Sequence, residues 1–142
     1  MQLRKQAHTV YKTQYHIVWI TRYRRKILQH GMELYFKDLI QEIHKFFPDI
    51  DILEAGTDKD HVHIHIVIPP KYAVSKIVEA IKSNTSRKMK EKFEYLSKVY
   101  WDGHGIWAVG FFVSTVGIDE HIIQNYVQMQ GEDDSGQLRL EL

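Results

Sequence analysis

Three histidines alternate with apolar residues in the segment TDKDHVHIHIVIPP, residues 57–70. Successive side chains of a β-strand point to opposite faces, so His61, His63 and His65 would share one face and the aliphatic residues between them the other. Neutral imidazoles two positions apart can chelate one divalent ion, and the neighbouring Asp60 could support such a ligand through a hydrogen bond. The alternative is a solvent-facing strand that tolerates polar residues, which accounts for one histidine better than for three.

A tyrosine and a glutamine near the C-terminus form a second candidate group. In HIIQNYVQMQ, residues 121–130, helical spacing places Ile122, Ile123 and Tyr126 on one stripe, and Gln130 lies one turn beyond Tyr126 on the same face. A tyrosine in an apolar stripe is most often a core residue. A glutamine beside it is unusual in a core, which suggests a role beyond packing.

Basic residues are unevenly distributed. Seven Lys or Arg precede the first acidic residue, Glu33, and a second basic set lies within residues 82–92, near Tyr and Phe. Lysine and arginine displace counterions from a polyanion and aromatic rings stack on bases, so both segments are candidate nucleic-acid surfaces, although the second could be a solvated helix face. The candidate DNA-binding residues are Arg22, Tyr23, Arg24, Arg25, Lys26, Lys82, Arg87 and Lys88.

Length and composition narrow the class of protein. The 142 residues suit one compact domain, and the lack of cysteine excludes disulfides and thiolate metal sites. No run approaches the roughly 18 apolar residues of a membrane span, and the basic N-terminus lacks the apolar region of a secretory signal. We therefore expect a cytoplasmic protein with no membrane association, with a single domain over residues 1–131 and an acidic tail over residues 132–142.

The elements that must position these residues follow from hydrophobic periodicity. Runs rich in β-branched or aromatic residues predict four strands, over residues 15–21, 49–58, 61–69 and 105–117. Helical spacing predicts three helices, over residues 31–47, 75–96 and 119–131, with Ser75 and Asp119 as N-caps and Gly131 as the last helix's end. This βαββαβ order, followed by a helix, predicts an α+β fold: a ferredoxin-like, RRM-like antiparallel sheet with helices on one face and a C-terminal helix carrying Tyr126.

Two known chemistries use a histidine string of this kind. HVHIHIV matches the motif of the histidine-triad nucleotide hydrolases, in which the middle histidine, here His63, is the nucleophile and no metal is needed. In that family the motif lies near the domain's C-terminus, whereas here two helices and a strand are expected to follow it. The shorter string His61-Val62-His63 matches the HUH motif of nucleases that use a tyrosine from a separate helix.

The whole chain resembles the single-tyrosine HUH transposases of the IS200 group. Four motifs occur in the same order: YHIVW with YRRK, DKDHVH, STVG, and Tyr126 followed by Gln130. The resemblance implies that His61, His63 and Gln130 bind Mg²⁺ or Mn²⁺ and that Tyr126 is the nucleophile. His65 stands where relatives usually have an aliphatic residue, so the resemblance assigns it no role.

The same resemblance implies an activity and partners. Such a transposase cleaves and rejoins single-stranded DNA at the ends of an insertion sequence through a 5′-phosphotyrosine intermediate. It recognises a DNA hairpin at those ends and works as a homodimer whose active sites are shared between subunits. A non-catalytic module that binds single-stranded nucleic acid is the remaining alternative; it would keep the basic residues but would not need Tyr126.

Overall fold

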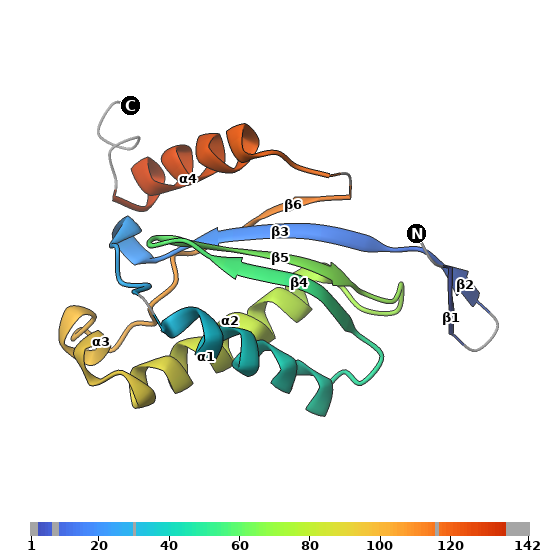
Figure 1. Ribbon diagram of the computed structural model, residues 1–142, viewed down its shortest axis with the longest axis horizontal. Helices are drawn as coiled ribbons and strands as arrows, with labels where there is room; N and C mark the ends of the chain where they lie inside the picture. The colour runs from blue at the N-terminus through green and yellow to red at the C-terminus, as the bar shows by residue number, and fades with distance from the viewer. Residues whose placement is uncertain (1–2, 7–8, 30, 116, 136–142) are drawn as a thin grey trace.

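A four-stranded antiparallel sheet forms the centre of the computed structural model, which describes residues 3–6, 9–29, 31–115 and 117–135 (Figure 1). The strands lie in the order β4-β5-β3-β6. Their bounds are β3 (Gln14–Ile20), β4 (Asp51–Thr57), β5 (His61–Val67) and β6 (Phe112–Ser114). The first and third strands of this set are central neighbours, which is the ferredoxin-like arrangement that the sequence predicts.

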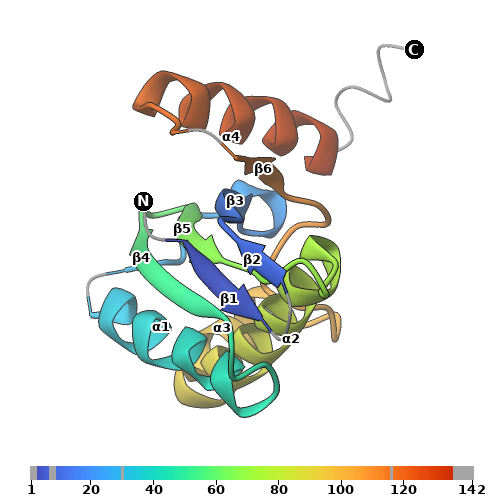
Figure 2. The same ribbon diagram turned by 90° about the vertical axis from the view of Figure 1, so that its right-hand side faces the viewer.

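Helices cover both faces of the sheet (Figures 1 and 2). Three helices and a 3₁₀ segment, η2, lie on one face: α1 (Met32–Ile40), η2 (Gln41–Lys45), α2 (Val74–Lys92) and α3 (Glu94–Val99). The C-terminal helix α4 (Glu120–Ser135) lies on the other face. A second 3₁₀ segment, η1 (Arg22–Arg24), follows β3. The predicted α+β class is therefore confirmed.

Side-chain alternation builds two apolar clusters, one on each face of the sheet. Val62 and Ile64 of β5 join the large core beneath α1 and α2, together with Trp19 of β3. Val18 of β3 points the other way and packs with Tyr126 of α4. Because β3 is apolar on both faces, α4 can be held on the sheet by the burial of apolar surface.

Helix boundaries differ from the predicted ones at three places. The second predicted helix begins at Val74, after Ala73, and Ser75 lies inside it. It is interrupted at Phe93, whose backbone is extended, so α3 is a separate short helix. The last helix does not end at Gly131 but continues to Ser135.

The predicted N-cap of α4 is confirmed, since the backbone N–H of Ile122 donates to Asp119 Oδ1 over 2.9 Å. The predicted domain boundary after residue 131 falls within α4. The rest of the predicted acidic tail, residues 136–142, lies outside the described residues.

Strand content also departs from the expectation at two places. The predicted strand over residues 105–117 is mostly irregular where the structure describes it, and among those residues only β6 and an isolated bridge between Trp107 and Thr21 pair with the sheet. An N-terminal hairpin of β1 (Arg4–Gln6) and β2 (Thr9–Tyr11) was not expected; it projects beyond the end of the sheet (Figure 1). Among the described residues, no helix is both long enough and apolar enough to cross a membrane.

Candidate active site

The histidines of β5 lie on the sheet face that α4 covers. In the antiparallel register, His61 pairs with Ile20, His63 with Val18, and His65 with His16 on β3. Ile20 and Val18 are the residues that pack against Tyr126. The structure thus confirms that the three histidines share a face, and places that face against the helix that carries the predicted nucleophile.

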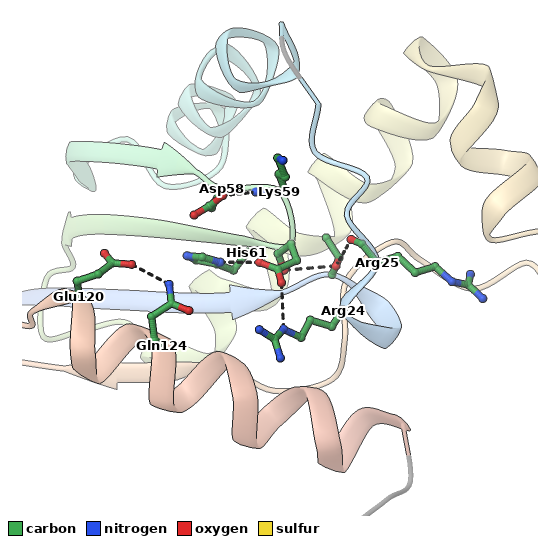
Figure 3. A network of polar contacts seen from close by, with 9 residues as sticks. Arg24, Arg25, Asp58, Lys59, His61, Glu120 and Gln124 are labelled. Carbon is green, nitrogen blue, oxygen red and sulfur yellow. Dashed lines mark hydrogen bonds and ion pairs between the residues drawn. The ribbon is translucent and has the colours of Figure 1, made fainter.

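His61 is held by an acidic neighbour. Its Nδ1 lies 2.8 Å from Asp60 Oδ1, and the Nε of Arg24 donates to Asp60 Oδ2 over 3.0 Å (Figure 3). A carboxylate can only accept, so Nδ1 of His61 carries a proton, and in the neutral ring Nε2 is then the nitrogen with the lone pair. The His61 hydrogen bond, and then Arg24, hold the pKa of Asp60 below its usual range against the opposing effect of burial. This arrangement is the one that orients a histidine as a metal ligand.

His63 supplies a second available ring nitrogen. Its Nε2 is buried and makes no hydrogen bond to any described residue. Burial is the main cause that lowers the pKa of His63, so the neutral ring is favoured. A buried nitrogen without a partner fits a site that is completed by a metal ion or by substrate. The described residues contain no group of three or more His, Asp or Glu side chains arranged to hold a metal, so these two histidines need a further ligand.

Tyr126 and Gln130 are engaged elsewhere when α4 packs on its own sheet. Tyr126 is 8% exposed, and its hydroxyl is buried with no hydrogen-bond partner in the described part of the chain. Its ring lies 5.7 Å from that of Phe112, and burial raises the pKa of the phenol. The Nε2 of Gln130 donates to the carbonyl oxygen of Val109 over 2.7 Å. The structure therefore places His61 and His63 on one strand face and Tyr126 in the apolar cluster that covers this face, but it shows no hydrogen bond from Tyr126 or Gln130 to either histidine.

A histidine that sequence reasoning missed completes a stack on this face. The ring of His16 lies 4.1 Å from that of His65, at an interplanar angle of 15°, and 5.7 Å from that of His63. His65 Nε2 is 3.0 Å from Gln14 Oε1. Both contacts of His65, with His16 and with Gln14, are to residues of the neighbouring strand β3. Only the pairing of β3 with β5 could have revealed this contact.

The predicted DNA-binding residues of the η1 loop are largely committed to contacts within the protein. Tyr23 and Arg24 have positive φ angles of 59° and 55°, which non-glycine residues seldom adopt. The backbone N–H of Tyr23 donates to a carboxylate oxygen of Asp134 on α4. The guanidinium of Arg25 lies over the rings of Tyr23 and Tyr100, at 5.1 and 5.2 Å. Tyr23, Arg24 and Arg25 are exposed despite these contacts, and the neighbouring Lys26 is exposed as well.

Lys82 and Arg22 brace the irregular segment before β6. Lys82 is only 8% exposed, and its ammonium donates to the carbonyl oxygens of Ala108 at 2.7 Å and Gly110 at 3.1 Å. Arg22 Nε donates to the carbonyl oxygen of Gly105 over 3.1 Å. Burial is the main cause that lowers the pKa of Lys82. These contacts give Lys82 a structural role that the sequence did not indicate.

The two remaining basic candidates lie further along α2. Lys88 forms an ion pair of 2.6 Å with Glu42 of η2. Arg87 is exposed and donates to Asn84 Oδ1 over 2.9 Å. Arg87 therefore presents its charge to solvent, whereas Lys88 is turned toward the helix layer.

Comparisons with known proteins place this chain among transposases. The family described as "Transposase IS200 like" matches residues 9–130. The transposase for insertion sequence element IS200 of Salmonella typhimurium is 32% identical over 128 residues, covering 90% of this chain and 83% of that protein. The ISDra2 transposase TnpA of Deinococcus radiodurans is 25% identical over 131 residues, covering 92% of each.

Solved structures agree with the sequence comparisons. A crystal structure of a protein from Deinococcus radiodurans R1, described as a transposase, has a TM-score of 0.76 at 27% identity, covering 89% of this chain and 97% of that one. A REP-associated tyrosine transposase bound to a REP hairpin shares the fold, with a TM-score of 0.52 at 12% identity, covering 94% and 74% of the two chains. From its sequence and its fold alike, the chain belongs to the family of IS200-like transposases.

Proposed function

We propose that this transposase cleaves and rejoins single-stranded DNA at the ends of an insertion sequence through a 5′-phosphotyrosine on Tyr126. One observation carries the proposal. His61 and His63, neighbours on one strand face, each keep a ring nitrogen without a protein partner among the described residues, on the face covered by the tyrosine helix. Family membership supplies the reaction class, and this pair of nitrogens supplies its site.

The proposed reaction exchanges one phosphodiester for another. The Tyr126 oxygen bonds to the scissile phosphorus while the bond to the 3′ oxygen breaks, so the phenol loses its proton and the departing 3′ oxygen gains one. Reversal rejoins DNA without ATP, because the phosphotyrosine conserves the bond. A tyrosine of ordinary pKa, about 10, is ionised to about one part in 1,000 at pH 7, a gap of roughly 4 kcal/mol. Burial raises the pKa of Tyr126 further, so its docked position is a resting one.

His61 and His63 fit a divalent metal ion, and Gln130 is the proposed third ligand. The ring of His61 is already oriented by Asp60, and the amide of Gln130 is held by the hydrogen bond from its Nε2 to Val109, which leaves Oε1 as the atom that would bind the ion. A bound Mg²⁺ or Mn²⁺ would polarise the scissile phosphate and stabilise the charge that develops on it. The protein residues do the rest: they orient the ligands, supply the nucleophile and hold the DNA.

We further propose that the active form is a homodimer in which α4 serves the partner's histidines. While α4 packs on its own sheet, the Tyr126 hydroxyl has no hydrogen-bond partner among the described residues, and Gln130 donates to Val109 rather than to His61 or His63. A closed two-fold exchange of α4 would give two equivalent composite sites. The proposed DNA partner is a hairpin at the element end, which is supported by a REP hairpin being the ligand of a structural relative. Exposed Lys26 and Arg87 are the proposed phosphate contacts.

The proposal is tested with single-stranded DNA that carries an element end and a label at its 3′ end. A 5′-phosphotyrosine retains the downstream fragment, so with Mg²⁺ we expect a labelled covalent adduct on a denaturing gel. DNA labelled at its 5′ end should give a shorter free strand and no adduct. Tyr126→Phe and EDTA should abolish the adduct.

Variants of the histidines separate the metal ligands from their neighbour. Because ligand loss removes part of the protein's hold on the ion, His61→Ala and His63→Ala should each lower adduct formation by about 10- to 100-fold or more. His65→Ala is the matched control and should cost much less. Full cleavage in EDTA would contradict the proposal, and loss of activity through His65→Ala alone would favour histidine-triad chemistry instead.

A further inference from the structure

Arg24 connects the site histidine to the tyrosine helix. Its Nε donates to Asp60 Oδ2 over 3.0 Å, and Asp60 Oδ1 lies 2.8 Å from His61 Nδ1. The side chains of Asp60 and His61 are 12% and 9% exposed, so water competes little for these bonds. Figure 3 shows Arg24 and His61 meeting the same carboxylate from two sides. Removing Arg24 would leave one buried carboxylate oxygen without this donor.

The helix side of this contact is built around Gly131. A Cβ added at Gly131 would lie 2.8 Å from Arg24 Cδ and 3.6 Å from its Cβ and Cγ. Glycine is a poor helix former, yet α4 continues through it to Ser135. The close approach of Arg24 gives a physical reason for a glycine at this position. Any larger residue must displace the Arg24 side chain.

The backbone of the η1 loop is fixed by the same helix. Tyr23 and Arg24 both have left-handed φ angles, and the N–H of Tyr23 donates to Asp134, one helical turn after Gly131. Such a conformation persists only where surrounding contacts determine it. The docking of α4 therefore contributes one of the contacts that hold the conformation from which Arg24 reaches Asp60.

We infer that Arg24 is a positioning residue that transmits the docking of α4 to His61. By holding Asp60, it fixes the ring orientation of His61 and the proton on Nδ1, and so presents Nε2. The inference rests on the proposed function in taking His61 as a metal ligand. It gives Arg24, a candidate phosphate contact by sequence, a role in the site itself.

The hydrogen bond of His61 can be observed in the metal-free protein. In protein with ¹⁵N-labelled histidine, a buried and hydrogen-bonded Nδ1 proton should give a distinct NMR signal, assigned by its loss in His61→Ala. We expect Arg24→Gln and Gly131→Ala to shift or abolish this signal. Gly131→Ala is the sharper variant, because it leaves every charge in place. Lys26→Gln removes one charge from the same loop and should leave the signal unchanged.

A titration with Mn²⁺ in the absence of DNA then measures whether the loss of this hydrogen bond weakens metal binding. We expect Arg24→Gln and Gly131→Ala each to bind Mn²⁺ about tenfold more weakly than the natural chain, and Lys26→Gln to bind within about twofold. If Arg24→Gln does not fold by circular dichroism, Arg24→Lys replaces it, since lysine keeps the charge but lacks the Nε donor.

The outcomes separate the two ideas. An unchanged His61 signal in both Arg24→Gln and Gly131→Ala overturns the inference, as does an equal change in Lys26→Gln. A natural chain that shows the His61 signal but binds no Mn²⁺ contradicts the proposed metal site instead, and a signal shifted by Gly131→Ala then still establishes the link from α4 to His61.

Discussion

His16 and His63 lie where burial disfavours a charged imidazole, and burial is the first cause that lowers the pKa of each. Neighbouring imidazoles lower both values further, whereas Glu54 raises both and Glu120 of α4 raises that of His63. A neutral ring is the form that a metal ligand needs. Protonation of His16 or His63 therefore destabilises the folded state.

The free energy of unfolding of the metal-free protein should therefore fall as the pH falls below about 6.5. Both folded-state pKa values lie below the ordinary imidazole value of about 6.5, so the unfolded chain takes up protons first. The stability from neutral His16 and His63 is complete above that pH and is lost on acidification. Urea denaturation at about pH 7.5 and about pH 5.5 measures it. His16→Phe, which keeps a ring in the stack, should show a smaller loss; an equal loss would contradict this account.

Lys82 should matter for stability more than for DNA binding. Lys82→Met leaves the carbonyls of Ala108 and Gly110 without their shared donor, and should lower the free energy of unfolding by about 1–3 kcal/mol. Lys88→Met, which breaks a partly exposed ion pair with Glu42, should cost at most about 1 kcal/mol. Urea denaturation of both variants tests the contrast. Native stability in Lys82→Met, together with weakened DNA binding, would return this lysine to the DNA surface.

At the scale of elements, hydrophobic periodicity was sufficient to predict a strand or helix where one face of that element is buried. The alternation in β5 and the apolar stripe of α4 both correspond to buried faces, and the order of the elements led to the correct sheet. The segment over residues 105–117 misled because its apolar residues suggest a strand that is interrupted only at Gly110. In the structure Gly110 has a φ of 93°, and the carbonyl oxygens of Ala108 and Gly110 accept hydrogen bonds from the ammonium of Lys82. The three-residue strands of the N-terminal hairpin are too short for any pattern to stand out.

For the candidate site, the sequence predicted the groups that are neighbours along the chain but not the contacts between distant segments. His61 and His63 lie on one strand and Asp60 directly precedes it, so local geometry was enough to group them. The contact of Arg24 with Asp60 joins residues 36 positions apart, and the stacking of His16 on His65 depends on strand register. Neither can be read from spacing in one segment. The resting position of Tyr126 likewise depends on how α4 docks, which the sequence does not encode locally.

At the scale of the whole molecule, the proposed shared site requires α4 to move. This helix carries Tyr126 and Gln130, the two residues proposed to complete the site, and it packs through one small apolar cluster rather than through the main core. A helix held in this way can be exchanged between two copies at little cost, because the same apolar contacts re-form on the partner's sheet. The resting and active states would then differ mainly in which sheet α4 covers.

Mixing two inactive variants tests this exchange. A His61→Ala, His63→Ala protein and a Tyr126→Phe protein should each form no adduct alone. If sites are shared between subunits, one site of each heterodimer contains both intact sets, and the mixture recovers cleavage. Subunit exchange is verified with differently tagged chains. A mixture that contains heterodimers and stays inactive would show that the sites form within one chain.

Locating the covalent bond tests the central claim most directly. The adduct formed with single-stranded DNA and Mg²⁺ is digested with nuclease and protease, and mass spectrometry finds the residue that carries the remaining nucleotide. We predict a single modified residue, Tyr126, linked to the 5′ phosphate of the downstream strand. A nucleotide on His63 or on another tyrosine, or cleavage that leaves no protein-bound nucleotide, would contradict the assignment of Tyr126 as the nucleophile.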